Sequence, residues 1–311
     1  MNTSPPFRLG TRGSPLAMWQ ARRVQTLLSE KMPDAAVEIA VIHTTGDKIL
    51  DKPLVQLGGK GIFTKEIENA LLAGEIDFAV HSYKDLPTRL PDGLAIVSVP
   101  ERDSPFDALL ARTGCCLKEL PAHPTIATGS LRRRAQVLAA RPDATVVDLR
   151  GNVNTRLRKY QESDWDAMIM AEAGVRRMEW TGRIAGVLPI EEMLPAPAQG
   201  ALAIEARGDD ESTRALLRII HDEAAAAGAR AERAFLATLE GGCQVPIAAY
   251  AVVEKGSLTL HGLVSSLDGT QLIRERQTAG IDDPEGAGRR LAESVWKSGG
   301  REIIEALQSL D

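Results

Sequence analysis

The chain is poor in cysteine and in aromatic residues. Three Cys occur among 311 residues, and Phe, Trp and Tyr together make up 4%. Cys115 and Cys116 are adjacent and Cys243 stands alone, so a disulfide among them would be strained or would leave one thiol over. We expect Cys115 and Cys116 to be reduced and partly buried, as is usual in a cytoplasmic protein. Leu, Val, Ile and Ala must then fill most of the core.

Metal-binding spacings and long apolar runs are also absent from the sequence. The five His and three Cys form no zinc-like pattern. No stretch approaches the ~18 uninterrupted apolar residues of a membrane span. Residues 1–15 carry neither the apolar run of a signal peptide nor the length of a transit peptide. We therefore expect a cytoplasmic protein with no metal site and no membrane segment.

Positive charge is not in excess. The formal net charge is −5, in a chain that is 44% hydrophobic and 25% charged. This balance argues against a dedicated nucleic-acid binder. It still permits Arg residues to line a cleft that attracts anionic ligands. The length predicts two or three soluble globular domains.

Strand patterns alternate with helix patterns over the first two thirds of the chain. Expected strands lie at 7–12, 37–42, 76–82, 94–100, 125–130, 145–150, 166–171 and 201–206. Expected helices lie at 15–32, 64–74, 131–141, 151–160, 172–178, 211–224 and 228–239. This alternation predicts parallel sheets with helices on their faces. Residues 43–62 hold five Gly or Pro without a sustained period, which is typical of a lid or a disordered loop.

The last part of the chain has a different pattern. Three β-type runs lie at 247–254, 257–265 and 271–277, separated by Lys-Gly and Asp-Gly turns. One long helical pattern follows at 284–309. These elements predict a small C-terminal α+β domain.

Three expected strand-to-helix turns carry Arg or hydroxyl side chains. They lie at 11–14, 128–133 and 150–152. Such turns place free backbone N–H groups and a positive helix end at the carboxyl end of a strand, where open α/β sheets bind ligands. Arg adds bidentate recognition of carboxylate or phosphate. Together the turns indicate a pocket for a molecule with several anionic groups.

The alternative for the run Arg132, Arg133 and Arg134 is a solvated helix face, which is the commoner role of an isolated basic run. The presence of three such turns in one chain favours the pocket. Farther along, Arg156 should stay near the entrance of its helix and Arg158 should face water.

Three further residues are candidates for chemistry or packing. Asp85 ends an expected strand and could act as a base or stabilise a cation, or it could be a turn acid that accepts backbone N–H bonds. His81 lies in the middle of that strand and is expected to be a packed core histidine. Cys243 follows two Gly residues, where the thiol could be exposed, or it could be a small buried side chain.

Seven motifs, taken in order, resemble those of the hydroxymethylbilane synthase family, whose members are also called porphobilinogen deaminases. They span nearly the whole chain and read LGTRGSPLAMWQA, GGKGIFTKEIE, HSYKDLP, TGSLRRRAQ, DLRGNVNTRLRK, PAPAQGA and EGGCQVP. The resemblance implies a transferase that joins four porphobilinogen molecules head to tail, releases ammonia and forms 1-hydroxymethylbilane. It also implies a dipyrromethane cofactor, held to Cys243 by a thioether.

The same resemblance implies the roles of individual residues. Asp85 matches the acid that stabilises the positive charge developing on the pyrrole nitrogen as ammonia leaves. The implied contacts to substrate and cofactor are Arg12, Ser14, Lys60, Ser82, Lys84, Thr128, Ser130, Arg132, Arg133, Arg150, Arg156, Arg177 and Gln199. Because every pyrrole carries an acetate and a propionate, the Arg-rich turns suit this ligand. The implied recipient of the product is uroporphyrinogen-III synthase, and family members are usually monomers.

The resemblance implies an α/β fold with two lobes like those of type II periplasmic binding proteins, plus the small C-terminal α+β domain. Domain 1 would comprise residues 1–100 and 200–218, domain 2 residues 101–199, and domain 3, which carries the cofactor Cys, residues 219–311. Some positions depart from the common pattern: Gln56 stands for Lys, Tyr83 for Met, and PAPAQG at 195–200 for PAVGQG. None of these changes removes a catalytic group.

Two other classes of protein remain as alternatives. A two-lobed solute-binding module would use the Arg clusters but would need neither Asp85 nor Cys243. A nucleic-acid binder is disfavoured by the negative net charge and by the scarcity of aromatic side chains for base stacking.

Overall fold

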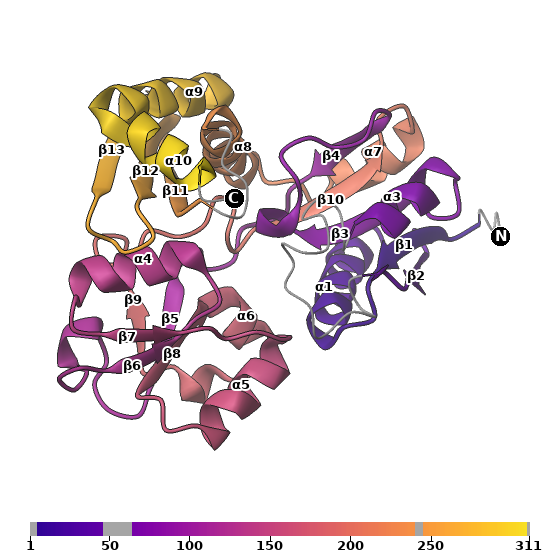
Figure 1. Cartoon of the computed structure of the whole chain (residues 1–311). Coiled ribbons are helices and arrows are strands. Elements are labelled where there is room, and N and C mark those ends of the chain that lie inside the picture. Colours follow the sequence, from indigo (N-terminus) through magenta and orange to yellow (C-terminus); the bar gives the residue numbers. More distant parts are fainter. Residues whose placement is uncertain (1–4, 46–63, 240–244, 310–311) are drawn as a thin grey trace. The chain divides into compact units, whose positions relative to one another are not determined.

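The structure, a computed structural model, describes residues 5–45, 64–239 and 245–309 (Figure 1). By spatial contacts the chain divides into two compact units. Unit 1 comprises residues 1–102 and 201–226, and unit 2 comprises residues 103–200 and 227–311. Three positions singled out in the sequence, Gln56, Lys60 and Cys243, lie outside the described residues, as does most of the predicted 43–62 loop.

Unit 1 is built on a five-stranded sheet with the order β2-β1-β3-β10-β4. Its strands are β1 (Phe7–Thr11), β2 (Val37–Val41), β3 (Phe78–Ser82), β4 (Leu94–Ser98) and β10 (Leu202–Arg207). Its helices are α1 (Pro15–Lys31), α3 (Lys65–Leu72) and α7 (Glu211–Arg218). β1 pairs in parallel with β2 and β3, whereas β10 runs antiparallel to both β3 and β4.

Alternation along the strands gives the unit 1 sheet two apolar faces. Phe78 and Val80 pack with residues of α1 and α7, while Ala79 packs with residues of α3. Helix α1 begins at Ser14, whose hydroxyl accepts the N–H of Ala17, and Pro15 at its first position has no N–H to satisfy. The sequence thus predicts this helix start correctly.

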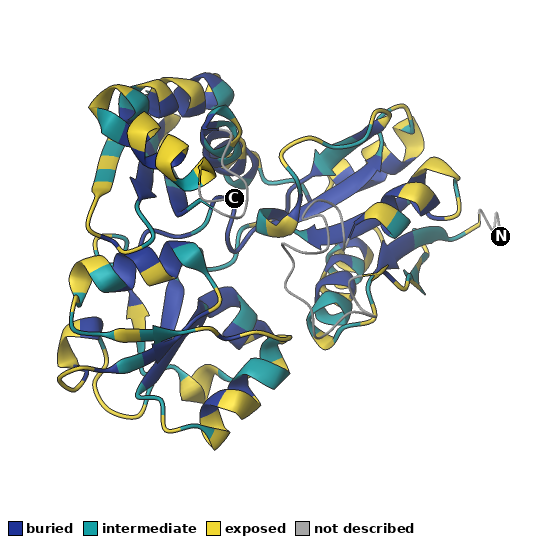
Figure 2. Cartoon of the chain, in the orientation of Figure 1, coloured by how far each residue is buried: buried dark blue, intermediate teal, exposed yellow. Residues whose placement is uncertain are grey.

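Unit 2 contains a second five-stranded sheet with the order β7-β6-β8-β5-β9. Its strands are β5 (Asp107–Ala111), β6 (Thr125–Ala127), β7 (Thr145–Val147), β8 (Ala167–Ala171) and β9 (Gly186–Leu188). The helices after β6, β7 and β8 are α4 (Leu131–Ala140), α5 (Val153–Glu162) and α6 (Glu172–Arg177). Figure 2 shows that β5 and β8 are mainly buried, while the edge strands β7 and β9 and the outer sides of the helices are more exposed.

The two five-stranded sheets have the same topology. In each, three strands are parallel, and the fourth runs antiparallel to both of its neighbours. The antiparallel strand is the first strand after the chain crosses into that unit: β5 follows the crossing at 102–103, and β10 follows the crossing at 200–201. The prediction of parallel sheets therefore holds for three strands of each sheet and fails for the antiparallel strand. In unit 1 that strand, β10, comes from a distant part of the sequence.

The C-terminal part of unit 2 is a three-stranded antiparallel sheet packed against helices. The strands are β11 (Ile247–Glu254), β12 (Ser257–Ser265) and β13 (Leu272–Gly280), paired in that order. The helices are α8 (Glu223–Thr238), α9 (Pro284–Val295) and α10 (Arg301–Gln308). Their apolar sides, including Phe235 and Leu291, form one core with the sheet. Two α/β lobes and a small α+β part confirm the predicted fold class.

Several local predictions are wrong. The final helix is not continuous, because Gly299 adopts a φ of +100° between α9 and α10, a conformation that favours glycine. α8 begins earlier than predicted, since the Asp222 carboxylate accepts the N–H of Ala225 and starts the helix there. β5 and β9 are absent from the predicted strands. Cys115 is exposed and Cys116 is half-buried, so partial burial is wrong for Cys115.

Short helical turns complete the fold. They are the 3-10 turns η2 (Tyr83–Asp85), η3 (Leu117–Glu119) and η4 (Thr181–Arg183), and the π-helical turn η5 (Trp296–Gly300). No helix in the described part of the chain is long and apolar enough to cross a membrane.

Candidate active site

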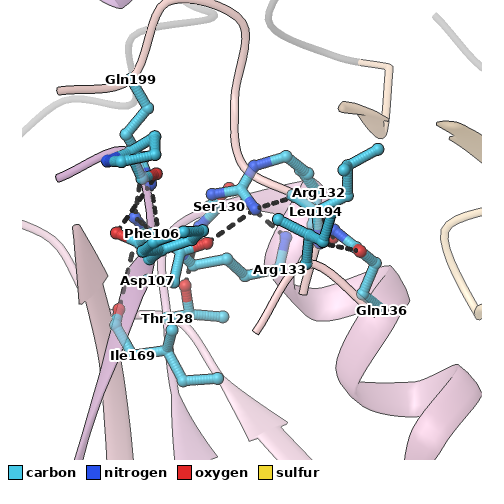
Figure 3. A network of polar contacts seen from close by, with 12 residues as sticks. Phe106, Asp107, Thr128, Ser130, Arg132, Arg133, Gln136, Ile169, Leu194 and Gln199 are labelled. Carbon is cyan, nitrogen blue, oxygen red and sulfur yellow. Dashed lines mark hydrogen bonds and ion pairs between the residues drawn. The ribbon is translucent and has the colours of Figure 1, made fainter. Parts of the chain in front are cut away.

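The centre of the polar network in unit 2 is the carboxylate of Asp107, at the first position of β5 (Figure 3). Arg132 Nη1 lies 2.8 Å from its Oδ2, and Arg133 donates to its Oδ1 from Nη2 at 2.7 Å and from Nε at 3.0 Å. Asp107 is fully buried, and each Arg is 5% exposed. The alternative of a solvated helix face is therefore excluded for Arg132 and Arg133 and holds for Arg134, which is exposed.

Local sequence places both guanidinium groups at this point. Ser130 caps α4 by accepting the N–H of Arg133, and it receives support from Thr128, whose hydroxyl accepts the N–H of Ser130. Arg132 and Arg133 thus occupy the first turn of a helix that begins directly after β6. The hydroxyl groups of Thr128 and Ser130, which were predicted to contact the ligand, accept backbone N–H groups at the start of α4 in this structure.

The charges in this network are unequal. Burial raises the pKa of Asp107, but the charges of Arg132 and Arg133 outweigh it and hold that pKa well below its usual range. Burial also lowers the pKa of the Arg132 guanidinium, which Asp107 opposes and Arg133 reinforces. One ionised carboxylate therefore faces two guanidinium groups, which leaves the buried cluster with an excess of positive charge.

The Nε side of the Arg132 guanidinium makes no hydrogen bond with the described residues. Both hydrogen bonds that Arg132 makes with described residues run from Nη1, to Asp107 and to the carbonyl oxygen of Leu194 at 2.7 Å. Its Nε is buried and has no acceptor in the described part of the chain. A guanidinium presenting Nε–H beside Nη2–H is the geometry that binds a carboxylate with two parallel hydrogen bonds.

Two glutamine side chains hold the network in place. Gln199 is fully buried, and its Nε2 donates to Asp107 Oδ1 at 2.9 Å and to the carbonyl oxygen of Pro105 at 2.8 Å. Gln136 exchanges hydrogen bonds with the backbone of Leu194, which fixes the carbonyl oxygen that Arg132 contacts. In Figure 3 the Gln199 and Arg133 side chains approach Asp107 from different elements.

The other predicted Arg residues of unit 2 have separate surroundings. Arg177 is 7% exposed, with its Nε 3.2 Å from Asp103 Oδ2 and its Nη2 donating to the carbonyl oxygen of Gly200. Arg150 is exposed and pairs with Asp148. Arg156 donates from Nε to the carbonyl oxygen of Gly151, so it lies at the entrance of α5 as predicted.

Arg158 is exposed, which also agrees with the sequence prediction. No group of His, Cys, Asp and Glu among the described residues could hold a metal ion.

In unit 1, the end of β3 carries the candidate acid. Asp85 lies in the turn η2, directly after the strand, and is exposed. Among the described residues, no hydrogen bond or ion pair reaches its carboxylate, so the alternative of a turn acid that accepts backbone N–H groups is not what the structure shows. Lys84 is half-buried, and the Ser82 hydroxyl accepts a hydrogen bond from Gln20 at 2.7 Å. Arg12 lies half-buried beside Ser14, at the end of β1.

Behind this turn, unit 1 buries a second polar cluster. His81 is 8% exposed, and its Nε2 lies 3.0 Å from Oε2 of Glu205, which is fully buried on β10. Glu68 of α3 is 7% exposed, and burial raises its pKa, as does the charge of Glu205. The prediction of a packed core histidine is confirmed.

Sequence reasoning missed Asp107, the residue at the centre of the unit 2 network. An Asp that follows Pro105 and Phe106 has the pattern of a turn acid, and the residues of β5, DALLA, show no alternation of apolar and polar side chains. The available signal was the pair Arg132 and Arg133 itself, since two buried guanidinium groups require an acidic partner.

Comparison with known proteins gives a consistent result. A family profile described as "Porphobilinogen deaminase, dipyromethane cofactor binding domain" matches residues 7–215, and one described as "Porphobilinogen deaminase, C-terminal domain" matches residues 226–297. The chain is 51% identical over 299 residues to the porphobilinogen deaminase of Syntrophomonas wolfei, covering 96% of this chain and 97% of that protein. It is 48% identical over 305 residues to that of Syntrophotalea carbinolica, covering 98% and 97%.

Among solved structures, a Salmonella typhimurium periplasmic binding protein with high arginine specificity is similar over 72% of this chain and 94% of its own, at 12% identity and a TM-score of 0.40. The family profiles and the near-full-length relatives decide the matter, and the chain belongs to the porphobilinogen deaminase family.

Proposed function

We propose that this protein polymerises four porphobilinogen molecules head to tail into 1-hydroxymethylbilane, with release of ammonia. The observation that carries this proposal within the fold is the buried pair Arg132 and Arg133, opposed by one carboxylate. The Nε of Arg132 has no acceptor among the described residues. A cluster with excess guanidinium charge suits a ligand that brings carboxylates. Each pyrrole of the growing product carries two of them.

The family implies a dipyrromethane cofactor, and the residues of unit 2 fit such a group. The donor set is rich in Arg, as a molecule with four carboxylates requires, and the buried Nε of Arg132, which has no acceptor in the described ranges, could donate to one of them. Arg132 and Arg133 would hold its carboxylates, with Arg150, Arg156 and Arg177 as further contacts. When bound, the group supplies the pyrrole carbon from which the product chain is extended.

We assign to Asp85 the stabilisation of positive charge on the substrate. When ammonia leaves porphobilinogen, the electrons of the broken C–N bond leave with the nitrogen. The remaining pyrrole is electron-poor, and its N–H becomes strongly acidic. A carboxylate beside that N–H stabilises the cation and can take and return the proton. Asp85 suits this role because it is exposed and no described residue occupies its carboxylate.

Further roles follow from the family resemblance. Cys243 is the proposed thioether attachment point, and Arg12, Ser14, Lys60, Ser82 and Lys84 are proposed supporting contacts. We propose the three-domain division 1–100 with 200–218, 101–199 and 219–311. We also propose a cytoplasmic monomer that passes its product to uroporphyrinogen-III synthase.

The first experiment is the intact mass of the purified, denatured protein. A retained excess equal to two linked pyrrole units, mapped to the peptide of Cys243, would support the covalent cofactor. Cys243→Ala should lose this mass, while Cys115→Ala and Cys116→Ala should keep it. A bare polypeptide that gains no mass on incubation with porphobilinogen would contradict the proposed function.

Asp85→Asn tests the catalytic assignment. The amide cannot stabilise the cation, so kcat should fall by about 100- to 1,000-fold, while the covalent pyrrole mass is retained. Product formation and intact mass are measured on the same preparation. Turnover within a few-fold of the parent protein would remove Asp85 from its role.

A further inference from the structure

One buried carboxylate clamps the linker of residues 195–200, which precedes the crossing into unit 1. Glu232 of α8 is fully buried. Its Oε2 accepts the backbone N–H of Ala198 at 2.5 Å, and its Oε1 accepts the backbone N–H of Ala251, on β11, at 2.8 Å. Hydrogen bonds from backbone N–H groups to an ionised carboxylate are among the stronger ones in proteins. Helix α8, strand β11 and the linker therefore meet at Glu232.

The clamped residue is held in an unfavourable conformation. Ala198 has a φ of +60°, in the left-handed region that disfavours any residue with a Cβ. Glycine, which has no Cβ, would adopt this conformation without strain. In this chain the surroundings must hold Ala198 there, and the Glu232 carboxylate bonds directly to its N–H.

The same turn places Gln199 and Gly200. Gln199 reaches Asp107 and the carbonyl oxygen of Pro105. Gly200 has a φ of +88°, and a Cβ at this residue would lie 2.5 Å from the carbonyl oxygens of Asp103 and Ser104. The 195–200 linker is thus packed, backbone to backbone, against the segment that leads into β5. A shift of the turn would move the Gln199 carboxamide away from Asp107.

We infer that Glu232 is a positioning residue for the Arg132–Arg133 carboxylate-binding cluster, acting through the Ala198 turn and the Gln199 carboxamide. The inference rests on the proposed function of that cluster. The two hydrogen bonds of Glu232 described above reach Ala198 and Ala251, so the inferred effect on ligand binding passes through Gln199 and Asp107. The competing role is a purely structural one, in which Glu232 only joins α8 to β11.

Glu232→Gln in the holoprotein tests this inference. The carboxamide has the shape of the carboxylate but turns an N–H donor toward one of the two backbone N–H groups. Since the cluster binds carboxylates in the ground state and in the transition state alike, we expect KM for porphobilinogen to rise about tenfold, with kcat nearly unchanged. Glu223→Gln, at the exposed start of the same helix, is the matched control and should leave both constants unchanged.

Two combined variants separate positioning from structural support. Ala198→Gly removes the need to hold a strained residue. In Glu232→Gln/Ala198→Gly, KM should therefore return most of the way to the parent value. Gln199→Leu should raise KM, and adding Glu232→Gln to it should raise KM little further, because both changes act on one path. Additive effects, or no rescue by Ala198→Gly, would overturn the inference in favour of the structural role.

Measurements that do not depend on enzyme activity can test the positioning role of Glu232 separately from the proposed function. Hydrogen exchange at the Ala198 amide should be at least about tenfold faster in Glu232→Gln than in the parent protein. The carboxamide NMR signal of Gln199 should shift in Glu232→Gln and not in Glu223→Gln. If the parent protein makes no hydroxymethylbilane, the proposed function fails, while these signals still decide whether Glu232 positions Gln199. An unmoved Gln199 signal would refute the positioning role.

Discussion

The buried clusters of unit 1 and unit 2 contain the same kinds of charged group in opposite proportions. In unit 1, His81 is the one base facing two carboxylates, Glu68 and Glu205. In unit 2, Asp107 is the one carboxylate facing two guanidinium groups. All of these side chains are at most 8% exposed, so water compensates little of either imbalance.

The excess charge of each cluster can be compensated in a different way. A carboxyl group can become neutral by binding a proton, and the raised pKa of Glu68 points that way. A guanidinium group keeps its proton at any ordinary pH, so the excess charge in unit 2 can be compensated only by another anion. The comparison explains why one cluster belongs to the folded core while the other suits a ligand that carries carboxylates.

The strongest test of this comparison is to remove the lone carboxylate from unit 2. Asp107→Asn leaves two buried guanidinium groups without a counter-charge, so we expect a loss of about 3–5 kcal/mol in the free energy of unfolding. Urea unfolding at neutral pH measures it. A loss under ~1 kcal/mol would mean that water reaches the cluster and that its charges are not confined.

Removing one of the two cations should have a smaller effect. Arg132→Met leaves Asp107 with one partner, Arg133, in a balanced pair, and the Leu194 carbonyl oxygen keeps its bond from Gln136. We expect a loss of about 2 kcal/mol by the same unfolding measurement. A loss as large as that of Asp107→Asn would contradict the view that unit 2 carries surplus positive charge.

Of the two clusters, only that of unit 1 should change its protonation, and with it the stability of the protein, as the pH rises. The folded-state pKa of Glu68 lies above its ordinary value of 4.5, so the folded state binds the proton more tightly than the unfolded chain does. Its contribution to stability is present below pH 4.5 and is lost as the pH rises through the raised pKa. Glu68→Gln keeps the neutral form and should be more stable than the parent protein above that window, by about 1 kcal/mol or less.

Unfolding curves collected from pH 4 to pH 8 measure the difference between the two proteins. Parallel pH profiles for Glu68→Gln and the parent protein would show that Glu68 is not the titrating group.

The smallest effect is expected at the surface pair of unit 2. The side chains of Arg150 and Asp148 are about half exposed, so their attraction is weakened by water. Asp148→Asn should change the free energy of unfolding by under ~0.5 kcal/mol, which makes it the exposed control for Asp107→Asn. A loss above ~1 kcal/mol would mean that exposure is not what separates the two pairs.

Local signals in the sequence predicted much of the fold. The start of α1 at Ser14 and Pro15, the helices after β6, β7 and β8, and the C-terminal hairpins all depend on residues close in sequence, and the structure confirms them. The strand β10 was also predicted, whereas β5 was not. The antiparallel pairing of both strands could not be predicted from local signals, because their neighbours in the sheet lie far away in the chain. Gly299 broke a helical pattern that remains apolar on both sides of it.

In the candidate site, too, the features that depend on nearby residues could be predicted, and those that depend on distant residues could not. Arg132 and Arg133 were identified from their place at a helix start, but their burial could not be foreseen, since it depends on Asp107, about 25 residues earlier. Glu232 carries no sequence signal at all, because a Glu within a helix is ordinary. Its importance arises only where three separate segments converge on one carboxylate.

The position of β10 between β3 and β4 has a consequence for synthesis on the ribosome. β4 ends at Ser98, and the strand that must separate it from β3 begins at Leu202. At ordinary translation rates, roughly 5–20 s pass between the two. All strands of the unit 2 sheet emerge in that interval, so it can close while β3 and β4 still lack their shared neighbour. The sheet begun first is therefore completed second, and its open edges are the part of the nascent chain most in need of protection.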